Sequence, residues 1–262
     1  MKPKLNAAAG GKGSLALTDL PKYTREVLGL YGLNVSTDLL VGADHRAIDK
    51  LRESADKASC PCLVLVETGA LAFAGDDEAK AEAAAERMRR VIQAAHRLGC
   101  NSAAMTVSGD RDASAVQIAA DRIKALLQGV DRIDLNLLVM SGEGVTKDPD
   151  KLTDLIKKIG GFRIGTFPDF EQAARAADAQ HYLRRLTPYA SALTASSVSF
   201  KTGKGGPVHQ PYDLIEMAKT VLSVGYQGTL AIDYRGEGDP EEGIAHTKAV
   251  LTAALGKEVE TE

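Results

Sequence analysis

Residues 62–107 begin CLVLVETG (62–69), continue through a stretch rich in Ala, Glu and Arg (76–98) and end NSAAMTV (101–107). The run 63–66 is apolar at every position, which is typical of a parallel strand that helices cover on both faces. Helix-favouring residues fill 76–98, and Gly99 follows them as a stop signal. The segment therefore predicts a strand, a helix and a second strand, which is the repeating unit of parallel α/β folds.

The same alternation extends along the chain in both directions. Apolar runs bounded by turn-forming residues predict eight strands, at 14–17, 32–35, 62–66, 102–107, 133–140, 162–167, 190–198 and 229–232. Helical patterns lie between and after them, at 19–30, 44–58, 76–98, 112–127, 148–160, 170–186, 211–224 and 239–255. Eight such repeats favour a single (β/α)8 TIM barrel, an α/β fold, over residues 14–255. A doubly wound sheet fits less well, because the glycine-rich run GGKG (10–13) precedes the first strand instead of following it.

Composition limits the classes of partner. The 262 residues have a formal net charge of −3 and no Trp, so the sequence predicts neither a nucleic-acid nor a membrane partner. No apolar run is long enough to span a bilayer. Three cysteines, Cys60, Cys62 and Cys100, predict reduced thiols and a cytoplasmic protein. Residues 1–13 lack an apolar signal core and are interpreted as a flexible tail, as are residues 256–262.

Five segments are similar to a known family in the same order along the chain. They are REVLGLYGLNV (25–35), QAAHRLGC (93–100), TKDP (146–149), GTFPDF (165–170) and GYQGTLAIDY (225–234). Together they resemble xylose-isomerase-like TIM barrels, the sugar phosphate isomerase/epimerase superfamily. The resemblance implies acid/base proton transfer on a small sugar, sugar phosphate or keto-acid, supported by one divalent cation (Mn, Co, Mg or Zn).

The same resemblance implies ligands for that cation, and most of them are missing here. The family pattern is a Glu after the fifth strand, an Asp and a His after the sixth, a His after the seventh and a Glu after the eighth. The matching positions of this chain are, in that order, Met140 or Ser141, Asp169 and Gln172, Thr194 or Ser196, and Asp233. We therefore expect a degenerate metal site and assign no metal ligand.

Acidic and hydroxyl side chains at strand ends are the candidate reactive groups. Asp169, Asp233 and Glu67, which ends the third predicted strand, are expected to act as acid and base, because barrel chemistry lies at the carboxyl ends of the strands. Thr194 and Ser196 are expected to bind a polyol by hydrogen bonds.

Four further residues are candidate ligand-binding groups with an alternative structural role. Lys201 and His209 belong to a cationic, glycine-rich loop that either closes over an anionic group or is a plain surface loop. Arg235 either binds substrate or pairs with Glu237. Glu143, within SGEG (141–144), either replaces the missing ligand or lies in a turn. The other histidines, at positions 45, 96, 181 and 246, fall in predicted helices of the outer ring.

Three functional hypotheses follow. The first is an isomerase or epimerase that works through acid/base proton transfer with a degenerate metal site. The second is a non-catalytic barrel that binds a carbohydrate-like ligand or a protein partner. The third, an endonuclease acting at abasic DNA sites, is disfavoured, because the chain lacks both the ligand set and the basic surface that it would need. A homodimer is expected on general grounds.

Overall fold

The computed structural model describes residues 5–6, 15–110, 112–203 and 206–256. Contacts divide the chain into two compact units, an N-terminal unit, Lys2–Thr166, and a C-terminal unit, Phe167–Glu262.

The N-terminal unit is built on a parallel five-stranded sheet. Its strands are β3 (Leu33–Ser36), β4 (Cys62–Ala74), β5 (Ser102–Gly109), β6 (Asn136–Met140) and β7 (Ile164–Thr166). Each strand pairs with the next one along the chain. A separate parallel pair joins β1 (Leu5–Asn6) to β2 (Leu15–Ala16). The unit's helices are α1 (Leu20–Glu26), α2 (His45–Lys57), α3 (Glu78–Leu98), α4 (Ala113–Gly129) and α5 (Pro149–Ile159), with short 3-10 turns at Leu17–Asp19, Thr37–Leu40 and Gly144–Thr146.

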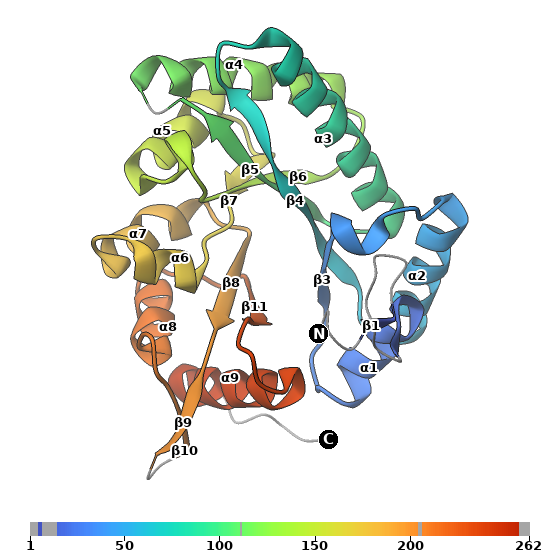
Figure 1. The fold of residues 1–262 in the computed structure, drawn as a ribbon, viewed down its shortest axis with the longest axis vertical. Helices are drawn as coiled ribbons and strands as arrows, with labels where there is room; N and C mark the ends of the chain where they lie inside the picture. The colour runs from blue at the N-terminus through green and yellow to red at the C-terminus, as the bar shows by residue number, and fades with distance from the viewer. Residues whose placement is uncertain (1–4, 7–14, 111, 204–205, 257–262) are drawn as a thin grey trace. The chain divides into compact units, whose positions relative to one another are not determined.

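Helices α3, α4 and α5 lie along this sheet (Figure 1). In α3, the buried residues Met88, Val91, Ile92 and Ala95 recur at the spacing of one helix face. In β6, Leu137, Leu138 and Val139 are all fully buried, as expected for a strand without polar alternation. The core of the unit therefore lies between the sheet and its helices.

The C-terminal unit contains two small sheets. β8 (Ala192–Ser197) pairs in parallel with β11 (Thr229–Tyr234), which places Ser196 opposite Asp233. β9 (Phe200–Gly203) and β10 (Gly206–His209) form an antiparallel hairpin. The helices are α6 (Phe170–Arg175), α7 (Ala179–Leu186), α8 (Leu214–Ser223) and α9 (Pro240–Leu255), with a 3-10 turn at Thr187–Tyr189. Helices α6, α8 and α9 contact β8, and α9 also contacts β11.

Every predicted strand region contains a strand, but three predictions about the elements were wrong. β4 does not end near Glu67 but continues to Ala74, with a register shift between Val66 and Ala70. The single helix predicted over 170–186 is two helices, because the chain is extended at Ala176 and Asp178 starts a new helix as its N-cap. The predicted loop after β8 is the β9–β10 hairpin.

Other predictions concern the ends of the chain and its cysteines. Within the predicted tail 1–13 only Leu5 and Asn6 are described, and they form β1. Within the tail 256–262 only Gly256 is described, as the left-handed C-cap of α9. The other residues of both tails lie outside the described residues. All three cysteines are free and buried, and none of the helices described is long and apolar enough to cross a bilayer.

Candidate functional site

Asp169 organises the polar residues of the C-terminal unit. It is the N-cap of α6, and its Oδ1 accepts the backbone N–H of Gln172 at 3.0 Å. Its backbone forms a parallel bridge with Thr194 of β8. The Oγ of Ser196 donates to the same Oδ1 at 3.0 Å and accepts the backbone N–H of Glu171 at 2.8 Å. The start of α6 is thus attached to the end of β8.

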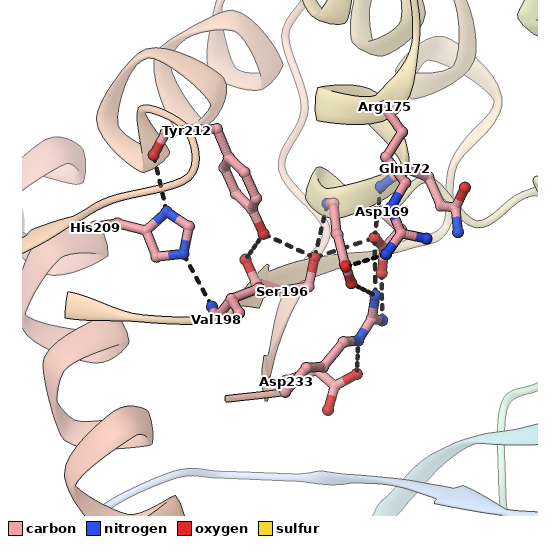
Figure 2. A network of polar contacts seen from close by, with 10 residues as sticks. Asp169, Gln172, Arg175, Ser196, Val198, His209, Tyr212 and Asp233 are labelled. Carbon is pink, nitrogen blue, oxygen red and sulfur yellow. Dashed lines mark hydrogen bonds and ion pairs between the residues drawn. The ribbon is translucent and has the colours of Figure 1, made fainter. Parts of the chain in front are cut away.

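The guanidinium of Arg235, just beyond β11, lies among three carboxylates. Its Nε donates to Asp233 Oδ2 at 2.8 Å, and its Nη2 to Asp169 Oδ2 at 2.5 Å. Its Nη1 donates to Glu171 Oε2 at 2.7 Å and to Asp169 Oδ1 at 3.2 Å. We call Asp169, Glu171, Asp233 and Arg235 the Arg235 cluster. Figure 2 labels Asp169 and Asp233, and both bind Arg235.

Electrostatics favour the charged form of this arginine. Burial opposes the positive charge, but the attraction of Asp169 and Asp233 and the hydrogen bonds to Asp169 and Glu171 outweigh it and raise the pKa of Arg235. A second cation, Arg175, forms an ion pair with the other oxygen of Glu171. Two guanidinium groups therefore offset most of the negative charge of the three carboxylates.

A chain of hydrogen bonds extends from this cluster to the end of β8 (Figure 2). The hydroxyl of Tyr212 donates to the carbonyl of Ser196 at 2.8 Å. His209 accepts the N–H of Val198 at Nε2, at 2.9 Å, and donates from Nδ1 to the carbonyl of Tyr212, at 2.8 Å. Burial raises the pKa of Tyr212 to about 12 and lowers the pKa of His209. Tyr212 therefore stays a hydroxyl donor, and His209 is held as a neutral ring with both nitrogens already bonded.

The structure brings together Asp169, Ser196, Asp233 and Arg235, with Thr194 beside them on β8. Arg235 pairs with Asp169, Glu171 and Asp233, and not with Glu237 as the sequence had suggested as an alternative. Lys201 is exposed on β9 of the hairpin, opposite Val208. Its partner in the glycine-rich motif, Lys204, lies outside the described residues.

Glu67 and Glu143 belong to the N-terminal unit. Glu67 is 5% exposed, accepts a hydrogen bond from Nε of Arg87 of α3 at 2.8 Å and forms an ion pair with Nη2 of the same arginine at 2.7 Å. It also accepts the N–H of Gly69 at 2.9 Å. Glu67 therefore lies inside β4 as the acidic partner of a salt bridge. Glu143 is exposed and is the N-cap residue of the turn Gly144–Thr146, where Gly144 has a φ of 74°.

Sequence reasoning missed Glu171 and Tyr212. Glu171 comes two residues after Asp169, and its only signal was an acidic residue in the first turn of a helix, which usually serves the helix dipole. Tyr212 precedes the N-cap Asp213 in the loop after β10, and no motif marks it. Both residues contribute to the site through the direction of their side chains, which the pattern of the sequence does not reveal.

The residues present do not fit the divalent cation that the family implies. The two expected imidazoles are replaced by the amide of Gln172 and by the hydroxyls of Thr194 and Ser196. Asp169 already accepts four hydrogen bonds, three on Oδ1 and one on Oδ2, so Oδ1 has no lone pair left for a metal ion. Among the described residues, no group of three or more His, Cys, Asp or Glu side chains is arranged to hold a metal ion.

Comparison with known families identifies the class of protein. The family model of xylose isomerase-like TIM barrels matches residues 28–254, and the chain belongs to that family. Its fold is the (β/α)8 barrel that the repeat pattern predicted. Among curated protein sequences, none matches this chain.

Solved structures agree with this fold. One is an L-ribulose 3-epimerase, with a TM-score of 0.75, 13% identity and coverage of 94% of each chain. Another is a D-psicose 3-epimerase solved in the presence of D-fructose, with a TM-score of 0.70, 12% identity and coverage of 93% of this chain and 92% of that one. A third is a xylose isomerase-like TIM barrel protein from Mycobacterium smegmatis in complex with magnesium, with a TM-score of 0.66, 17% identity and coverage of 95% and 91%. At such identities the likeness extends to the fold.

Proposed function

We propose that this protein is an isomerase or epimerase that moves a proton between neighbouring carbons of a small sugar, sugar phosphate or keto-acid. The observation that supports this proposal most is the Arg235 cluster, in which acidic side chains from the N-terminus of α6 and from the carboxyl end of β11 meet a guanidinium. Strand ends of this kind are where (β/α)8 barrels perform chemistry. Structural neighbours named as D-psicose and L-ribulose 3-epimerases favour a ketose as the first substrate to examine.

Asp233 is the best candidate for the general base. Its side chain is 52% exposed, and among the described contacts only its Oδ2 is engaged, by Nε of Arg235. Its Oδ1 is left to accept a proton from a ligand carbon. Asp169, in contrast, accepts three hydrogen bonds on Oδ1 and one on Oδ2 and is 8% exposed, so we assign it a positioning role in place of the catalytic role that the sequence suggested.

The remaining candidates are assigned by the contacts that they make. Thr194 is proposed to bind a ligand hydroxyl, and exposed Lys201 to attract a phosphate or carboxylate. The hydroxyl of Ser196 is fully buried and already bonded to Asp169 and Glu171, so we propose that Ser196 positions the start of α6 in place of the ligand-binding role that the sequence suggested. His209 has no ring nitrogen left for a ligand, so we propose that it shapes the end of β8. Glu67 is proposed to be structural because Arg87 engages it. Glu143 remains a candidate ligand-binding residue.

Exchange of carbon-bound hydrogen with deuterated water tests the proposal. Purified protein is incubated in D2O with D-fructose, D-psicose, D-tagatose or L-ribulose, and loss of the carbon-bound proton signals is followed by NMR. We expect exchange with at least one ketose, and we expect Asp233→Asn to slow it by roughly 100-fold or more. Glu237→Gln, which removes a carboxylate from the same loop outside the cluster, should keep the wild-type rate. Absence of exchange across ketoses, their phosphates and keto-acids would count against catalysis.

The alternative is a non-catalytic barrel that binds a carbohydrate-like ligand or a protein partner. The observation that favours it is that all three carboxylates of the cluster already bind one guanidinium, which weakens each of them as a base. Calorimetric titration with the same ketoses separates the two functions. Saturable binding without deuterium exchange supports the binder, and binding with exchange supports the enzyme.

We further propose a cytoplasmic homodimer. Three free, buried thiols suit a reducing compartment, and cyclic dimers are the commonest soluble assemblies. Sedimentation velocity of the purified protein tests the dimer, and a monomer at micromolar concentration would contradict it. Cell fractionation tests the location.

A further inference from the structure

The charge at the Arg235 cluster is arranged as it would be around a bound cation. Carboxylates from the N-cap of α6, from its first turn and from β11 all point at one positive group. In a metal-dependent barrel, a divalent ion neutralises such acids and polarises the ligand. Here the positive group is a side chain of the protein itself.

We infer that Arg235 is the resident cation of this site, taking the place of a divalent ion in neutralising Asp169, Glu171 and Asp233. The inference concerns the charge of the site and does not depend on turnover, so a failure of the deuterium-exchange assay leaves it intact.

The hydrogen bonds and the positive charge of Arg235 together oppose the binding of a divalent ion to Asp169. Oδ2 of Asp169 accepts from Arg235, and Oδ1 accepts from Arg235, Ser196 and the N–H of Gln172. A metal bonded to Oδ1 would have to displace one of these donors, and a metal on the second lone pair of Oδ2 would share that oxygen with Arg235. It would also lie beside a guanidinium, whose charge repels it and, unlike that of a lysine, is never lost by deprotonation.

The same geometry leaves Arg235 a hydrogen-bond donor for a ligand. Its four hydrogen bonds to the cluster use four of the five N–H groups of a guanidinium and leave one on Nη2. The side chain is 34% exposed. The remaining N–H is therefore available to an oxygen of a bound ligand, where it would stabilise negative charge that develops on a carbonyl oxygen.

Removing the guanidinium should turn the cluster into a site that accepts a metal. In Arg235→Gln, three carboxylates lose their shared cation and repel one another. A divalent ion added to this variant can then bind the folded state alone and stabilise it by mass action. Arg235→Lys keeps a positive charge but loses the fork of donors, so it should be less stable than the wild type without gaining a response to metal.

The experiment measures the melting temperature of chelator-treated protein with and without 5 mM MnCl2, together with Mn²⁺ binding by EPR. The wild type should show no shift and no stoichiometric binding. Arg235→Gln should melt several degrees lower in chelator, recover with Mn²⁺ and bind about one ion. Asp169→Asn/Arg235→Gln should lose the recovery. Arg175→Gln, which frees Glu171 from its second partner while leaving Asp169 and Asp233 bound to Arg235, should gain no response.

Two results would overturn the inference. One is stoichiometric Mn²⁺ binding to the wild type that Asp169→Asn abolishes, and this result can be obtained even if Arg235→Gln does not fold. The other is an Arg235→Gln protein that is as stable as the wild type in chelator and does not respond to Mn²⁺.

Discussion

His209 shows how the contacts of a single residue limit the roles that the sequence suggests for it. Its place in the loop after β8 suggested a ligand-binding imidazole. In the structure the ring lies between Phe200 and Tyr212, and each nitrogen bonds to the backbone, to Val198 N–H and to the carbonyl of Tyr212. A proton added at Nε2 would face the N–H that this nitrogen now accepts. The type and position of the residue suggested a ligand-binding role, whereas the direction of each ring nitrogen favours the structural role that we propose.

This arrangement predicts a pH dependence of stability. Burial lowers the pKa of His209 below its ordinary value of 6.5 in the folded protein. As the pH falls below that value, the unfolded chain takes up the proton first, so the free energy of unfolding decreases until the folded pKa is passed. Urea unfolding at pH 7.5 and pH 5.5 should therefore show the wild type to be less stable at pH 5.5.

Substitution of the ring identifies the source of this dependence. His209→Phe should cost about 1–3 kcal/mol at pH 7.5, because the N–H of Val198 loses its acceptor, and it should reduce the difference between the two pH values. His96→Gln, on the exposed side of α3, should retain the wild-type difference. A His209→Phe protein with an undiminished pH difference would show that another group is responsible.

At the scale of elements, aspartate marks the starts of the helices. Eight helices have an Asp N-cap whose carboxylate accepts backbone N–H groups of the first turn, at Asp44, Asp77, Asp112, Asp148, Asp169, Asp178, Asp213 and Asp239. Of these caps, Asp169 is the one that also binds Arg235, so the site includes an ordinary helix N-cap. This is why the sequence could predict Asp169 at the start of a helix without revealing that it also accepts hydrogen bonds from Ser196 and Arg235.

A cap away from the site tests whether these aspartates stabilise the helices that they begin. The Oδ1 of Asp213 accepts the N–H groups of Ile215 and Glu216 at 2.9 and 3.0 Å. Asp213→Ala should lower the free energy of unfolding by about 1 kcal/mol in urea denaturation, whereas Asp213→Asn, which keeps an acceptor oxygen, should cost much less. Equal losses in both variants would mean that the carboxylate does not act as a cap.

Two segments show where the periodicity of the sequence fails to predict the strands. The residues Glu67, Thr68 and Gly69 look like a turn, yet β4 continues through them by a shift of register. The run 200–209 looked like a loop because glycines interrupt it, although Gly203 and Gly206 are the ends of paired strands. Both errors arise because pairing with another segment, which a local pattern does not contain, decides whether a glycine lies in a strand or between strands.

At the scale of the whole molecule, the order of strands and helices sufficed to predict the barrel, and the family match confirms it. That order depends on hydrophobic burial, which tolerates large changes of sequence, so neighbours only 12–17% identical retain the fold. The chemistry depends instead on a few polar groups. The expectation that Asp169 and Asp233 come close follows from parallel strand ends, but the guanidinium between them depends on one side chain that lies two residues past the family position.

Anomalous diffraction from crystals soaked in manganese chloride tests this account most directly. We predict that Arg235 remains bonded to Asp169, Glu171 and Asp233, with no manganese peak within bonding distance of any of these carboxylates. A manganese ion coordinated by Asp169 and Asp233, with the guanidinium of Arg235 turned away, would contradict it.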